Sequence, residues 1–115
     1  MTVRVNKQFE NVNDGIQNMI AAATHDYNEF CSNENMQQEF TEGWVVKEGQ
    51  KYIKISTRNG NSAWGFIVNT DNDKKFQKGD ILKCAGYSAP ARNKARGNVL
   101  SGGFNIQWTG PLYLW

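Results

Sequence analysis

The sequence predicts an α+β protein in which an N-terminal amphipathic helix and a short second helix pack on an antiparallel sheet of four to five strands. Three observations favour this class. Apolar residues recur every three to four positions in the first third of the chain, strand-like segments follow after residue 43, and turn signals separate them. The 115 residues suit a single domain, residues 1–115.

The helical pattern lies on one stripe, formed by Val12, Ile16, Met19, Ile20, Ala23, Tyr27, Phe30 and Cys31. We expect Asn13 or Asp14 to cap this helix by accepting a hydrogen bond from a free backbone N–H group. A shorter helix that carries Met36 is expected to end at Gly43.

The strand-like segments are residues 44–46, 51–56, 63–68, 80–84 and 104–108. Glu48-Gly49 and Asn59-Gly60 suit hairpin turns, because glycine and asparagine tolerate positive φ. Short hairpin connections predict antiparallel pairing. We expect Pro111 to end the last strand and the apolar residues 112–115 to pack against the domain.

Several functional classes lack support in the sequence. No apolar run reaches the roughly 18 residues of a membrane helix, and the N-terminus shows no secretory signal, so we expect a cytoplasmic protein. One histidine, His25, and two cysteines without a CxxC pair argue against a metal site, and we expect no cofactor. His25 and Cys31 are six residues apart on the predicted helix, so no nucleophile and base pair is apparent.

Charge is divided unevenly along the chain. Residues 1–50 carry a net charge of −5, whereas residues 51–115 carry +7, for a total of +2. A cationic C-terminal half is compatible with an anionic partner. Attraction between the two halves within the fold is an equally good interpretation of the charges alone.

The segment between the strands at 80–84 and 104–108, AGYSAPARNKARGNVLSGG, is long for a connection in a small domain. It predicts an anion site, because arginine binds phosphate through two parallel hydrogen bonds and an aromatic ring can stack on a base. A helical turn opening at Pro90 would add free N–H groups. The alternative is that its arginines cover a solvated face or pair with the acidic helix. The candidate ligand-binding residues are Tyr87, Arg92, Asn93, Lys94, Arg96, Asn98 and Trp108.

The stretch FQKGDILKCAGYSAPARNKARGNVLSGGFNIQWTGPLYL resembles small proteins of tailed bacteriophages that carry a GDILK-like strand followed by an APA(R/K)N…ARGN-like loop. The likeness covers about residues 43–114. Such proteins often have a tryptophan shortly before APA, where this chain has Tyr87. A phage origin implies a role against host defence, and the parts present are those of phage anti-Thoeris proteins that sequester nucleotide signals.

These observations together predict a non-catalytic protein of the host cytoplasm that binds and sequesters a small anionic nucleotide ligand, such as a cyclic nucleotide or cyclic ADP-ribose. We expect Arg96→Ala to abolish binding without unfolding the domain, and we expect a homo-oligomer. The alternatives are an inhibitor that binds a host enzyme and a single-stranded nucleic-acid binder, although a net charge of +2 is low for the latter. An enzyme acting on nucleotides comes last, because no general base is evident.

Overall fold

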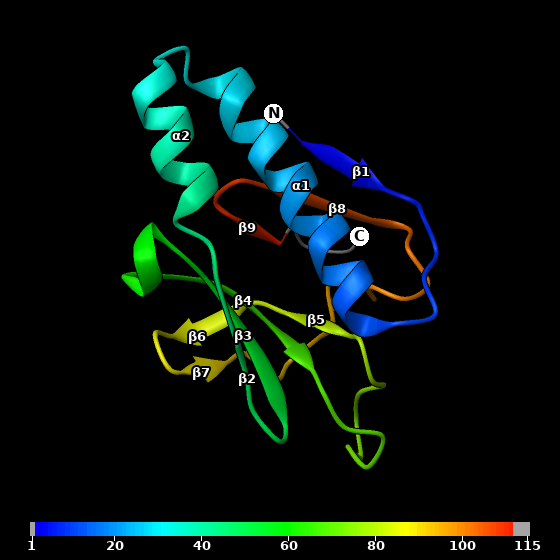
Figure 1. The fold of residues 1–115 in the computed structure, drawn as a ribbon. Helices are drawn as coiled ribbons and strands as arrows, with labels where there is room; N and C mark the ends of the chain where they lie inside the picture. The colour runs from blue at the N-terminus through cyan, green and yellow to red at the C-terminus, as the bar shows by residue number, and fades with distance from the viewer. Residues whose placement is uncertain (1, 112–115) are drawn as a thin grey trace.

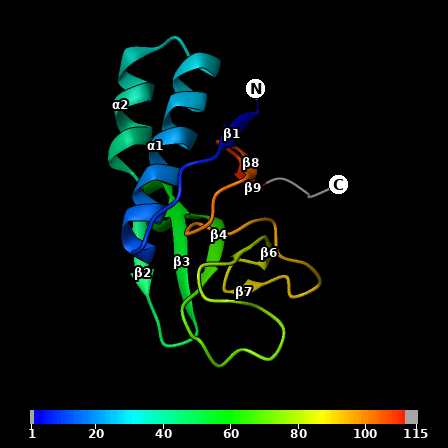
Figure 2. The same ribbon diagram turned by 90° about the vertical axis from the view of Figure 1, so that its right-hand side faces the viewer.

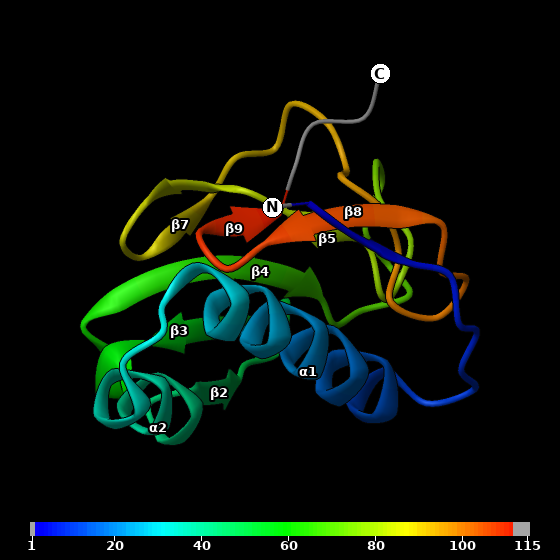
Figure 3. The same ribbon diagram turned by 90° about the horizontal axis from the view of Figure 1, so that it is seen from above.

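The computed structural model describes residues 2–111 and confirms the α+β class. Two helices lie side by side next to an antiparallel main sheet, and a second, smaller sheet lies beside the first helix (Figures 1 and 3). In chain order, the elements are β1 (Val3–Val5), α1 (Val12–Phe30), α2 (Glu34–Glu42), β2 (Val45–Glu48), β3 (Tyr52–Thr57), the 3-10 turn η1 (Arg58–Gly60), β4 (Ser62–Val68), β5 (Ile81–Leu82), β6 (Cys84–Gly86), β7 (Ala89–Pro90), β8 (Phe104–Gln107) and β9 (Gly110–Pro111).

The helices begin at asparagine caps. The Asn11 side chain accepts hydrogen bonds from the backbone N–H groups of Asn13 (2.8 Å) and Asp14 (3.3 Å), so the cap lies two to three residues before the predicted positions. Asn33 caps α2 in the same way, and α2 ends at Gly43 as predicted. In the predicted apolar stripe, Ile16, Met19, Ala23 and Tyr27 are buried and Val12, Ile20 and Cys31 are partly buried, whereas Phe30 is 67% exposed.

The main sheet has four antiparallel strands in the order β2-β3-β4-β5. Hairpin turns join β2 to β3 and β3 to β4 at the two predicted places, around Gly49 and Asn59-Gly60. Successive side chains of each strand point to opposite faces of the sheet. Ile53 and Ile55 of β3 contact the α1 side, whereas Tyr52 packs on the opposite face with Phe66.

A second sheet, in the order β1-β8-β9, corrects two sequence predictions and adds a strand that was not predicted. Residues 104–107 pair with β1 and β9 rather than with the main sheet, and residues 3–5, which showed no clear strand signal, form its edge. Pro111 does not end β8 but pairs with Ile106 as part of β9. This pairing is tolerated because β9 is an edge strand, where proline does not interrupt a ladder. The predicted packing of residues 112–115 lies outside the described residues.

The core lies between α1 and the two sheets. It is formed by Val5, Ile16, Met19, Ala23, Ile53, Ile55, Trp64, Ile67, Ile81, Val99, Phe104 and Ile106. A β-bulge between Ile55 and Ser56 leaves Trp64 without a partner in the register and turns its ring into this core. A second, smaller cluster of Phe66, Val68, Phe76 and Leu82 covers the other face of the main sheet. Neither helix in residues 2–111 is long and apolar enough to cross a membrane.

Candidate functional site

The segment predicted to hold the site begins as a β-hairpin rather than a helical turn. Pro90 pairs with Cys84 across the β6–β7 hairpin, and Ala91 N–H donates to the Lys83 carbonyl (2.7 Å), so no helix opens at Pro90. Tyr87 and Ser88 form the hairpin tip between Gly86 and Ala89. The hairpin lies on the side of the main sheet away from the helices (Figure 2).

A cavity of about 420 Å³ opens between this hairpin and the main sheet, and we call it the basic groove. Small-molecule sites commonly measure about 300–1,000 Å³. Its walls combine cationic, aromatic and hydroxyl side chains with one valine, two glycines and one glutamate. The lining residues are Val45, Lys47, Glu48, Gly49, Tyr52, Lys54, Ser56, Gly60, Phe66, Tyr87 and Ser88.

Two cations face each other inside the basic groove. Lys47 of β2 lies directly opposite Lys54 of β3 in the antiparallel register, so both side chains project from the same face of the sheet. Like charges at directly opposed positions repel, and an anion between them would remove that repulsion. The Lys54 ammonium also lies 3.3 Å from the centroid of the Tyr87 ring, and Tyr87 remains 55% exposed.

Arg92 lies beside the basic groove, and its guanidinium is already paired. Both terminal nitrogens donate to the Asp73 carboxylate at 2.9 Å, and one of them also donates to the Tyr52 hydroxyl. The hydrogen bonds that Asp73 accepts from Arg92 and from the backbone N–H groups of Lys75 and Phe76 hold the pKa of Asp73 well below its usual range. The hydrogen bonds that Arg92 donates to Asp73 and Tyr52 raise the pKa of Arg92. Arg92 therefore orients Tyr52 and holds the loop that contains Asp73.

Arg96 and Asn98 contribute to the fold rather than to the basic groove. Arg96 is only 3% exposed, and one terminal nitrogen donates to the Asn93 side chain at 3.4 Å. The Asn98 amide donates to the Lys78 carbonyl and to Asp80, while its oxygen accepts from the N–H groups of Leu100 and Ser101. The side-chain amide of Asn98 thus joins the loop to the segment of Lys78 and Asp80, and both its nitrogen and its oxygen are engaged within the fold.

The three remaining predicted residues lie apart from the groove lining. Asn93 and Lys94 are exposed, and the Asn93 carbonyl accepts a hydrogen bond from the Lys75 ammonium at 2.9 Å. Trp108 lies on the helix side, where its ring contacts Tyr27, Phe30 and Phe40. Of the seven predicted residues, only Tyr87 lines the basic groove, and Arg92 reaches it through Tyr52.

The residues that sequence reasoning missed lie on β2 and β3. Lys47, Tyr52, Lys54 and Ser56 line the groove. The sequence predicted the last three only as part of a strand, and Lys47 followed the predicted strand at 44–46 without an assigned role. A signal was present, because the polar positions of KYIKIS alternate with apolar ones. That alternation fixes which side chains share a face, but only the pairing with β2 shows that a second lysine joins them.

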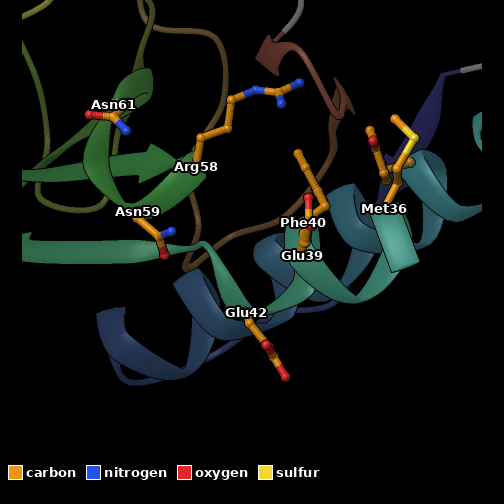
Figure 4. Close-up of a pocket in the computed structure, with 8 residues that line it drawn as sticks. Met36, Glu39, Phe40, Glu42, Arg58, Asn59 and Asn61 are labelled. Carbon is orange, nitrogen blue, oxygen red and sulfur yellow. The ribbon is translucent and has the colours of Figure 1, made fainter. Parts of the chain in front are cut away.

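A second cavity, of about 470 Å³, lies between α2 and the η1 turn, and we call it the Arg58 pocket (Figure 4). It is lined by Tyr27, Met36, Glu39, Phe40, Glu42, Arg58, Asn59 and Asn61. From the sequence, these residues were predicted only as parts of the two helices and of the turn at Asn59-Gly60. In residues 2–111 no group of three or more histidine, cysteine or acidic side chains is arranged to hold a metal ion.

The fold and the two cavities define a small antiparallel α+β protein with an open cationic groove. The chain belongs to the family described as "Family of unknown function (DUF7717)", whose model matches residues 2–114. No curated protein and no solved structure matches the chain significantly.

Proposed function

We propose that the protein binds a small nucleotide-derived anion in the basic groove and retains it without chemical change. The observation that carries this proposal is the pairing of Lys47 with Lys54 on one face of the sheet, with the Tyr87 ring above Lys54. Two ammonium groups supply charge for phosphate oxygens. The exposed part of the Tyr87 ring supplies a surface on which a base can stack. The groove therefore offers groups for both the phosphate and the base of a nucleotide.

The phosphate contacts in this proposal come from the two lysines, whereas the sequence predicted them for the arginines. Arg92 and Arg96 are respectively ion-paired and buried, whereas the groove presents Lys47 and Lys54 with the hydroxyls of Ser56 and Ser88. Hydroxyls can donate to or accept from a ribose or phosphate. Sequestration of a cyclic nucleotide signal of host defence, as the resemblance to phage proteins implies, is the biological role that we propose for such binding.

Calorimetric titration tests the proposal with a panel of cyclic di-AMP, cyclic ADP-ribose, ADP-ribose and inorganic phosphate. We expect stoichiometric binding of at least one nucleotide and weak binding of phosphate alone. Chromatography of ligand released by boiling should recover it intact, which also tests the expectation that the protein is not an enzyme. Absence of binding across the panel, or conversion of the ligand, contradicts the proposal.

A matched pair of lysine variants places the binding in the groove. Lys54→Gln should weaken nucleotide binding by roughly tenfold or more, because a charge-assisted hydrogen bond contributes about 1.5–3 kcal/mol. Lys74→Gln changes the net charge equally at an exposed position outside the groove lining. Equal affinities of the two variants would show that net charge alone, and not the groove, attracts the ligand.

Inhibition of a host enzyme by direct protein contact is a second candidate. It is favoured by the large apolar side chains exposed near the α1–α2 connection, where Phe30 is 67% and Met36 48% exposed. A stoichiometric protein partner captured from host lysate, with no small ligand bound, would support it. Single-stranded nucleic-acid binding remains a prediction that a salt-dependent gel shift would support.

The predicted homo-oligomer has a candidate interface at β2. This strand forms one edge of the main sheet, its four residues are all exposed, and Val45 and Val46 are 39% and 38% exposed. An uncovered edge strand can pair with the same strand of a second copy. Light scattering should show a dimer that Val46→Glu converts to a monomer, and a monomeric wild-type protein contradicts the prediction.

A further inference from the structure

The η1 turn places two residues with side chains in the left-handed backbone region. Arg58 has φ of 55° and Asn59 has φ of 60°. Asparagine tolerates this region, but arginine has no special preference for it, so Arg58 is held in an unfavourable backbone conformation. The turn is held by α2, because Asn59 N–H donates to the Gly43 carbonyl at 2.8 Å. Strained residues held in this way are concentrated at functional sites.

The strained backbone directs the Arg58 side chain across the Arg58 pocket. Figure 4 shows it extending from the turn toward the part of α2 that carries Phe40 and Met36, whereas Glu42 points to the other side. Gly43 allows this close approach, since a Cβ there would lie 3.1 Å from the Arg58 backbone nitrogen. The position of the guanidinium therefore depends on the contact between α2 and the turn.

The floor of the Arg58 pocket is aromatic. The rings of Tyr27 and Phe40 stack with centroids 4.1 Å apart and planes inclined by 9°, and both residues are at least 95% buried, so only a small part of each ring reaches the cavity. Met36 adds a half-exposed apolar side chain at the rim. Such a surface suits the apolar body of a small ligand.

The charged groups of the pocket do not neutralise one another. Arg58 and Glu39 both line the cavity, yet within residues 2–111 no salt bridge or side-chain hydrogen bond joins Arg58 to any residue. An arginine beside an apolar floor can bind a planar carboxylate through two parallel hydrogen bonds. Glu39 would repel a ligand that carries several negative charges, such as a polyphosphate.

We propose that the Arg58 pocket is a binding site for the single carboxylate of an aromatic organic acid, with the guanidinium on the carboxylate and the ring against Met36 and the small exposed parts of Tyr27 and Phe40. Asn59 and Asn61 line the same cavity and supply amide groups for a further polar substituent. This site is separate from the basic groove, so it stands independently of the proposed nucleotide binding.

A titration followed by amide NMR spectra tests the site with phenylacetate, its uncharged analogue 2-phenylethanol and inorganic phosphate. Phenylacetate should shift the amide signals of Glu39, Asn59 and Asn61 in a saturable way, and the other two probes should leave them unchanged. Equal responses to phenylacetate and 2-phenylethanol would overturn the proposal, and so would phenylacetate shifts confined to other parts of the chain.

Variants assign the contact to Arg58. Arg58→Gln should raise the phenylacetate dissociation constant by roughly fivefold or more, as expected for the loss of a charged hydrogen bond. Arg4→Gln, at the exposed position of β1, removes the same charge elsewhere and should have no effect. Glu39→Gln leaves the turn intact and should strengthen binding by reducing repulsion. Unchanged affinity in both Arg58→Gln and Glu39→Gln contradicts the proposal.

Discussion

The hydroxyl of Tyr87, at the tip of the β6–β7 hairpin, donates a hydrogen bond to the carbonyl oxygen of Gly60 in the η1 turn. This bond joins the hairpin that borders the basic groove to the turn that carries Arg58. The two cavities are therefore bordered by the same short turn, and the position of one wall of the groove depends on it.

Removing this hydroxyl should loosen the hairpin while keeping its ring. Tyr87→Phe is expected to increase hydrogen exchange of the β6–β7 amides and to reduce nucleotide affinity only slightly. Tyr87→Ala also removes the stacking surface, which contributes about 1–3 kcal/mol per base, and should reduce affinity further. Exchange mass spectrometry and calorimetry measure the two effects. Equal affinities of both variants would show that the ring does not contact the ligand.

The Arg92–Asp73 ion pair should make stability depend on acid pH. The pKa of Asp73 is lower in the folded protein than in the unfolded chain, where it is about 3.9. The ion pair therefore stabilises the fold fully above the pKa of the unfolded chain, and this stabilisation is lost as pH falls toward and through the pKa of the folded protein. Urea unfolding of wild type and Asp73→Asn should therefore differ by a constant amount from neutral pH to about pH 5 and converge below about pH 4. A difference that persists in strong acid contradicts this assignment.

Arg96→Ala should destabilise the fold rather than act on binding alone, which revises the expectation drawn from the sequence. The side chain is 3% exposed, and its removal leaves a cavity together with unsatisfied neighbours, at a cost of about 2–4 kcal/mol. Lys74→Ala at an exposed position should change stability by less than about 0.5 kcal/mol. Thermal and urea unfolding compare the two. A fully stable Arg96→Ala protein would restore the original expectation.

In Gly15→Ala, helix propensity and packing have opposite effects on the stability of the protein. In an exposed helix this change stabilises by about 1 kcal/mol. In α1 a Cβ at Gly15 would collide with the Val99 carbonyl oxygen and approach the Val99 side chain to 3.0 Å. We expect a lower melting temperature and a lower free energy of unfolding. Exposed Ala21 offers a matched control, because Ala21→Gly in the same helix should destabilise only by its propensity.

The sequence predicted most of the fold because its local signals agree with the tertiary structure. The stripe from Val12 to Tyr27, the turn at Asn59-Gly60 and the alternation in KYIKIS each determine a local structure that packing preserves. The second sheet was not predicted, since β1 has three residues and pairs with β8 about one hundred residues later. Such pairing leaves no local pattern.

The candidate site was predicted less well, for a related reason. Arginine and asparagine in a loop indicate anion binding only if they face solvent, and burial of Arg96 is decided by contacts that no local pattern reveals. Arg92 was also assigned to a ligand because its partner, Asp73, lies in a different loop. The lysine pair in the groove depends on the register of β2 with β3, which is likewise a property of the fold.

The tryptophans of residues 2–111 lie closer to the Arg58 pocket than to the basic groove. The three tryptophans in residues 2–111, Trp44, Trp64 and Trp108, belong to one chain of ring contacts that runs through Phe40. The rings lining the basic groove are instead Tyr52, Phe66 and Tyr87. The indole signal of these three tryptophans should therefore respond to a ligand in the Arg58 pocket more than to one in the basic groove, without any added label.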